Sequence, residues 1–153
     1  MCKWLKIVFV FLLLFFVSCG HEEMRQTIPF AHVNFRIDTS VGGRDHALRN
    51  PLTYKIFMEN DRRTPTDRMG FGGLLIVSGF DNEIFAFDLA CPFERNPNIR
   101  VVPNSNGEAV CSSCGSVFIT SFGLGTVRSG VARAPLQRYR VYRQESGVFL
   151  VRN

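Results

Sequence analysis

Apolar and polar residues alternate, or gather in short apolar runs, along most of the chain from residue 33 onward. Val33, Phe35 and Ile37 alternate with polar residues, which is typical of a strand with one buried face. Later short apolar runs are separated by turns that contain glycine, proline, aspartate or asparagine. Together with an alternating segment at residues 136–142, these runs predict strands at residues 54–58, 74–77, 84–87, 101–102, 109–110, 117–119 and 148–151. Such a series of short strands predicts an all-β domain of sandwich or barrel type over residues 33–153.

Two of the predicted strands form a hairpin. Residues 74–77 and 84–87 flank the turn at residues 79–82, which contains glycine, aspartate and asparagine. A strand, not a helix, follows the glycine-rich residues 70–73, so they predict a turn and not a phosphate-binding loop. Residues 61–68 form a polar break, and residues 54–58 fit either a strand or a short helical segment.

The first 18 residues follow a different pattern. Lys3 and Lys6 precede eleven consecutive apolar residues at positions 7–17, and Ser18 and Cys19 come next. A positive flank, a short apolar run and a small-residue cleavage site are typical of an export signal. A membrane-spanning helix needs about 20 apolar residues. Residues 1–18 are therefore predicted to be a signal peptide.

The end of this signal, Phe16-Val17-Ser18-Cys19, resembles the lipobox of bacterial lipoproteins. The resemblance implies lipidation of Cys19 and a place in the bacterial cell envelope, on the outer or inner membrane, facing the periplasm or the surface. Residues 19–32 are then a lipid-anchored tether, because residues 20–23 are polar and should stay solvated. The acidic pair Glu22-Glu23 resembles surface-export tags of Bacteroides-type lipoproteins, with a plain linker as the alternative. A signal peptide cut elsewhere is the alternative to lipidation.

Charge does not point to a nucleic-acid partner. Removal of residues 1–18 takes away Lys3 and Lys6 and no acidic residue, so the formal charge falls from +5 to +3. Nucleic-acid binding would need basic residues clustered on one face. Arg138, Arg140 and Arg143 come nearest, but they alternate with other residues as the solvated face of a strand does.

Cysteines carry the candidate chemistry. Cys2 leaves with the signal and Cys19 is the anchor, so Cys91, Cys111 and Cys114 remain in an exported domain. Disulfides form and persist in that setting. Cys91 follows a predicted strand, and Cys111 and Cys114 form a Cys-x-x-Cys turn.

Around these cysteines the chain resembles the Rieske iron–sulfur domain, over residues 70–153. The hairpin in residues 72–88 resembles the one that leads into the family's first cluster loop. Residues 91–94 align with that loop, Cys-x-His, and residues 111–118 align with the second loop, Cys-x-x-His-Gly-Ser-x-Phe. Residues 130–141 match the stretch that closes the family's fold. The resemblance implies stacked antiparallel sheets with two loops that form a cluster-type site.

Both histidine ligands of that family are replaced in this chain. Rieske centres hold one iron with two cysteines and the other with two histidines. Cys91 and Cys111 stand at the cysteine positions, whereas Phe93 and Cys114 stand at the histidine positions. A phenyl ring has no lone pair to donate. We therefore expect that the ordinary 2Fe-2S cluster is lost and that the domain is a binding or structural module with no catalytic residues.

Three other uses of the thiols stay open. Cys91 and Cys111, or Cys111 and Cys114, could form a disulfide. The three cysteines could instead hold zinc, with His32, His46 or an acidic residue as the fourth ligand. They could also hold a non-standard iron–sulfur centre, which would make the protein a carrier of single electrons. The expected partners are the membrane, through Cys19, and an unknown envelope protein or ligand.

Overall fold

The computed structural model describes residues 27–153, so the predicted signal peptide, Cys19 and most of the predicted tether lie outside the described residues. Within this range the chain forms strands and two short 3-10 helices, η2 (His46–Arg49) and η3 (Glu59–Asp61). The strands are β1 (Val33–Asp38), β2 (Tyr54–Phe57), β3 (Arg68–Met69), β4 (Leu74–Ser78), β5 (Ile84–Asp88), β6 (Val101–Pro103), β7 (Glu108–Cys111), β8 (Val117–Ile119), β9 (Thr126–Ser129), β10 (Arg138–Glu145) and β11 (Val148–Arg152).

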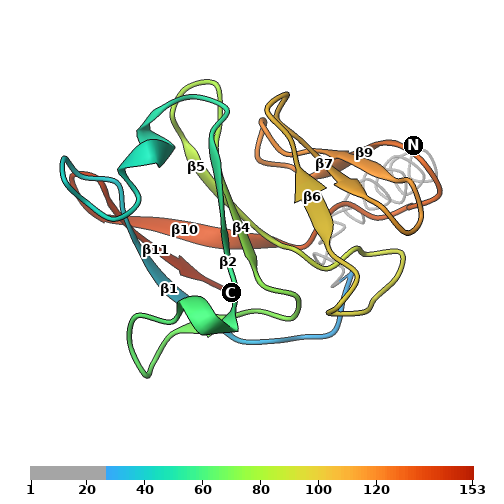
Figure 1. Cartoon of the computed structure of the whole chain (residues 1–153), viewed down its shortest axis with the longest axis horizontal. Coiled ribbons are helices and arrows are strands. Elements are labelled where there is room, and N and C mark those ends of the chain that lie inside the picture. The colour runs from blue at the N-terminus through green and yellow to red at the C-terminus, as the bar shows by residue number, and fades with distance from the viewer. Residues whose placement is uncertain (1–26) are drawn as a thin grey trace, which may run out of the picture.

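Antiparallel pairing joins these strands into two sheets. The larger sheet has seven strands in the order β2-β4-β5-β10-β11-β1-β3, and the smaller sheet has four in the order β6-β7-β8-β9. Figure 1 shows the smaller sheet, in yellow and orange, beside one end of the larger sheet. The prediction of an all-β domain with antiparallel sheets is confirmed.

Most of the predicted strands are present, and two further strands are added. The hairpin of β4 and β5 is confirmed, with Leu74 opposite Asp88, and residues 54–57 form a strand and not a helix. The strand β3 begins at the last residue of the segment predicted to be a polar break, and it pairs two residues with β1. The strand β9 is a mostly exposed edge strand. Both lack a buried apolar run, so hydrophobic periodicity did not predict them.

The hairpin of β4 and β5 buries both of its faces. Because successive strand residues point to opposite faces, alternate side chains enter two different cores. Leu74 and Ile76 belong to the first core, with residues of β1, β2, β10 and β11. Leu75 and Val77 belong to the second core, with residues of the smaller sheet. The hairpin is thus the common wall of both cores.

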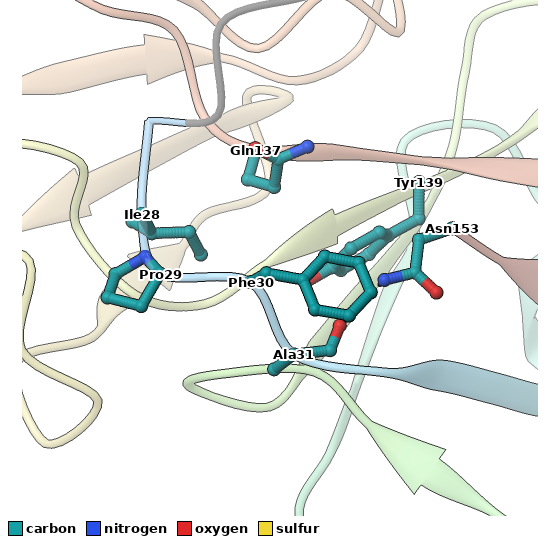
Figure 2. Close-up of a pocket in the computed structure, with 7 residues that line it drawn as sticks. All are labelled: Ile28, Pro29, Phe30, Ala31, Gln137, Tyr139 and Asn153. Atoms are coloured by element: carbon teal, nitrogen blue, oxygen red, sulfur yellow. Dashed lines mark hydrogen bonds between the residues drawn. The ribbon is translucent and has the colours of Figure 1, made fainter.

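The segment before β1 already packs on the domain. Ile28 is buried although it lies within the predicted tether. The side chain of Asn153 donates a hydrogen bond to the Ala31 carbonyl at 2.7 Å and accepts one from Val33 N–H at 3.2 Å. Figure 2 shows residues 28–31 running beside Gln137, Tyr139 and Asn153. The cavity between them measures about 40 Å³, room for a few water molecules at most.

No helix within residues 27–153 is long and apolar enough to cross a bilayer.

The buried carboxylate of Asp45 joins the loops over the first core through hydrogen bonds and ion pairs. Asp45 is fully buried and accepts hydrogen bonds from both terminal nitrogens of Arg63 at 2.8 and 2.7 Å and from Lys55 Nζ at 2.7 Å. The Arg63 guanidinium also lies 4.8 Å from the centre of the Phe35 ring. Burial acts to raise the pKa of Asp45, but the hydrogen bonds from Arg63 and Lys55 outweigh it, so the pKa is lowered.

Asp45→Asn should lower the free energy of unfolding by about 3 kcal/mol at pH 7, because it leaves Arg63 without its buried counter-charge. The folded pKa of Asp45 lies below its unfolded value. The carboxylate therefore stabilises the fold above the unfolded pKa, and this contribution is lost as the pH falls through the folded pKa. Urea titrations should show the difference between the two proteins shrinking below about pH 4. The control Asp81→Asn, in an exposed turn, should change stability by less than about 0.5 kcal/mol.

Candidate metal centre

Three cysteines from two loops meet in the second core. Cys91 follows β5 directly after a bridge between Ala90 and Arg100. Cys111 is the last residue of β7 and pairs with Val101 on β6. Cys114 lies in the turn between β7 and β8. Cys91 and Cys111 are fully buried, whereas Cys114 is half-buried. The site therefore joins the loop that follows β5, an inner strand of the larger sheet, to a loop of the smaller sheet.

The sulfur atoms are spaced as ligands of a single ion would be. All three Sγ atoms lie within 4.8 Å of one another, and Cys91 Sγ and Cys114 Sγ are 3.7 Å apart. A tetrahedral zinc ion with zinc–sulfur bonds of about 2.3 Å has ligands about 3.8 Å apart. Within residues 27–153 the three thiols are free, with no disulfide between them.

Backbone and hydroxyl groups surround the sulfurs. Cys91 Sγ accepts hydrogen bonds from the backbone N–H groups of Phe93 and Glu94. Cys114 Sγ lies 3.2 Å from Ser116 Oγ, which in turn accepts a hydrogen bond from Ala132 N–H at 3.0 Å. Groups of this kind orient thiolate ligands and stabilise their charge. The serine after the Cys-x-x-Cys turn thus connects Cys114 to the segment that follows β9.

The environments of Cys91 and Cys114 shift their pKa values in opposite directions. Burial raises the pKa of the Cys91 thiol to about 12. Burial also acts to raise the pKa of Cys114, but hydrogen bonds from the Ser116 hydroxyl and backbone outweigh it, so the pKa is lowered. The thiolate is the form that binds metals and attacks disulfides. Of these two thiols, Cys114 is therefore the one that ionises more readily.

A buried aspartate positions the start of the first loop. Asp88 accepts hydrogen bonds from Ala90 N–H at 2.7 Å, from the turn residues 71–72 at 2.7 and 2.9 Å, and from the Tyr139 hydroxyl at 2.7 Å. Burial raises the pKa of Asp88 in spite of these donors. The four bonds tie the end of β5, just before Cys91, to the glycine turn and to β10.

The structure brings together some of the predicted site residues and leaves others apart. Cys91, Cys111 and Cys114 meet as a group, and among residues 27–153 no histidine or carboxylate joins them within 4.8 Å. The ring of His32 lies against Phe30, and His46 Nδ1 lies 3.1 Å from the Gly43 carbonyl. Neither histidine is therefore placed as the fourth ligand.

Two supporting residues were not predicted from the sequence, and Phe93 has an unexpected setting. Phe93, at the first histidine position of the Rieske resemblance, is 54 % exposed. Asp88 is the single charged residue in an apolar strand that follows a glycine-rich turn. This combination could have identified it from the sequence as a buried supporting residue. Ser116 stands at the serine of the Rieske-like second loop, but the sequence assigned it no role; it is fully buried and contacts Cys114.

Comparison with known proteins adds no relative: no family model matches the chain, and no curated protein matches it. The Rieske resemblance therefore stays a prediction from the residues that carry it. The all-β fold and the group of three cysteines are properties of the structure itself.

Gly130→Ala should lower the free energy of unfolding more than Gly42→Ala, a substitution at another glycine with positive φ. Gly130 has φ +102°, and an added Cβ would lie 2.4 Å from Ser116 Cα. Gly42 also has positive φ, at +80°, but a Cβ there would have open space. Urea unfolding should show a loss of about 1–2 kcal/mol for Gly42→Ala. The loss for Gly130→Ala should be larger by about 1–3 kcal/mol, because Ser116 must also move. Equal losses would contradict the close contact.

Proposed function

We propose that this protein is a lipid-anchored module of the bacterial cell envelope whose β domain holds one metal ion. Zinc is the first candidate for this ion. The observation that carries the proposal is the spacing of the three sulfur atoms within 4.8 Å. Thiolate ligands favour soft or borderline ions such as zinc, copper(I) and iron. Zinc has no redox chemistry and takes tetrahedral sites of this kind.

The ion would have a structural role. Cys91 belongs to the loop after β5 of the larger sheet, and Cys111 ends β7 of the smaller sheet. A metal bound to both loops would hold the two sheets together at this end of the second core. It would also keep the thiols from forming disulfides in an oxidising compartment. The domain is then a binding or structural module, and the bound ion serves its stability.

We also propose that the domain is a Rieske-like scaffold without the ordinary cluster. Support comes from the two loops, which meet at one site as the resemblance implies, and from Phe93, which cannot bind iron. In a Rieske centre, the residue at position 114 would bind a different iron from Cys91 and Cys111. Ligands of different irons do not share one tetrahedron. The 3.7 Å between Cys91 Sγ and Cys114 Sγ suits one ion better.

Electron transfer is the second candidate. Tetrahedral sulfur sites hold iron as well as zinc. The N–H groups of Phe93 and Glu94 that bond to Cys91 Sγ favour this alternative, because hydrogen bonds to sulfur ligands set the reduction potential of iron–sulfur centres. An iron-loaded site would make the protein a carrier of single electrons.

The metal is tested by elemental analysis. The full chain, purified in detergent without oxygen, should contain one zinc and no inorganic sulfide, and Cys111→Ser should lose the zinc. A chelator should lower the melting temperature of the parent protein and leave that of Cys111→Ser unchanged. Two irons and two sulfides per chain would instead identify an electron carrier. A metal-free protein with one disulfide by mass would show that the cysteines have a covalent structural role.

The anchor is tested separately. Cys19→Ser should move the protein from the membrane fraction to the soluble fraction, because each buried CH₂ of an acyl chain contributes about 0.8 kcal/mol to anchoring. Mass spectrometry of the N-terminal peptide should show acyl chains on the parent protein and none on the variant. The zinc content should not change. A variant that stays in the membrane with an unmodified N-terminal peptide in both proteins would contradict lipidation.

A further inference from the structure

The two loops of the metal centre have the same backbone design. In the first loop, Arg95 N–H donates to the Cys91 carbonyl at 2.9 Å, and Arg95 has φ +51°. In the second loop, Gly115 N–H donates to the Cys111 carbonyl at 2.9 Å, and Gly115 has φ +69°. Each loop is thus a single turn that begins at a buried cysteine and closes at the fifth residue in the left-handed region.

This equivalence gives each residue of one loop a counterpart in the other. Cys91 corresponds to Cys111, and the fourth residue of the second turn is Cys114, whose sulfur lies within 4.8 Å of Cys111 Sγ. The fourth residue of the first turn is Glu94. Glu94 therefore stands to Cys91 as Cys114 stands to Cys111.

We propose that Glu94 is the fourth ligand of the metal ion, through one carboxylate oxygen. The proposal rests on the proposed function, in which Cys91, Cys111 and Cys114 bind the ion. Zinc accepts carboxylate oxygens at about 2.0–2.2 Å beside thiolates. In the structure the Glu94 carboxylate lies outside the group of three sulfurs. To bind the ion, its side chain would have to turn toward them.

The surroundings of Glu94 agree with this role. Its own backbone N–H donates to Cys91 Sγ, which places the residue at the edge of the site. The side chain is half-buried. Within residues 27–153 it takes part in none of the four ion pairs. None of these ion pairs holds the Glu94 carboxylate away from a bound cation.

The neighbouring residue has a different setting. Phe93 occupies the position at which the Rieske resemblance places a ligand, yet it is the third residue of its turn and is 54 % exposed. The third residue of the other turn, Ser113, is exposed as well. The metal site of this protein is therefore built on the first and fourth residues of both turns. Four protein ligands would close the site, which is typical of structural zinc and not of catalytic zinc.

The experiment is a cobalt(II) titration of the full chain in detergent without oxygen, followed by competition with zinc. Four proteins are compared: the parent, Glu94→Ala, Glu94→Cys and the matched control Phe93→Cys. Glu94→Ala should weaken cobalt and zinc binding by at least the roughly 10–100-fold that loss of a supporting partner costs. Added azide should then change its cobalt spectrum, because a coordination position is open. The spectrum of the parent should not respond to azide.

The two introduced thiols test the position of the ligand. Glu94→Cys should strengthen the sulfur-to-cobalt charge-transfer absorption and show a four-thiolate spectrum, whereas Phe93→Cys should leave the spectrum of the parent unchanged. Both positions lie in a partly exposed turn, so both variants should fold, which circular dichroism checks. Unchanged affinity in Glu94→Ala, or a four-thiolate spectrum in Phe93→Cys alone, would overturn the assignment of Glu94 and leave the three-cysteine site intact. Absence of cobalt binding in the parent would overturn the proposed function itself.

Discussion

The rest of the structure depends on the hairpin of β4 and β5, whose two faces are both buried. Leu74, Ile76 and Ala86 face the first core, while Leu75 and Phe87 face the second. A strand with two buried faces carries a continuous apolar run instead of an alternation. The runs at residues 74–77 and 84–87 have this form. Because the hairpin is shared, the larger sheet and the smaller sheet are parts of one domain and not two separate units.

The candidate metal centre is a continuation of that hairpin. β5 ends at Asp88, whose carboxylate is held by the turn at residues 71–72 and by Tyr139, and Cys91 follows three residues later. Cys91 and Cys111 are members of the second core and not side chains on its surface. Their burial excludes water from two of the three sulfurs. The same burial that stabilises the core thus also shapes the chemistry of the site.

Local patterns predicted the parts of the fold that depend on local sequence. The hairpin and the strands β1, β10 and β11 have clear apolar signals, and the Cys-x-x-Cys turn identified one half of the site. Contacts between distant segments left no local signal. The ion pair of Asp45 and Arg63 joins residues 18 positions apart, and the hydrogen bond of Tyr139 to Asp88 spans 51 positions.

The first loop shows the limit of motif alignment. The Rieske pattern aligns Phe93, the second residue after Cys91, with a histidine ligand of the family. Arg95 N–H donates to the Cys91 carbonyl, and this bond makes Glu94, the fourth residue of the turn, the counterpart of Cys114. Equivalence between two turns depends on backbone conformation at Arg95 and Gly115, and one of these residues is not glycine. Sequence alone therefore gave no reason to compare the two loops.

The division into two cores has a consequence for how the domain opens. Even within one domain, parts of the structure can open as cooperative units, each with its own opening free energy. The first core contains residues of β1, β10 and β11, whereas Cys91 and Cys111 belong to the second core. Loss of the proposed ion should then open the smaller sheet, while the larger sheet, which includes the shared hairpin, stays folded. In hydrogen exchange, amides of β6 to β8 would lose protection on chelation and those of β11 would keep it.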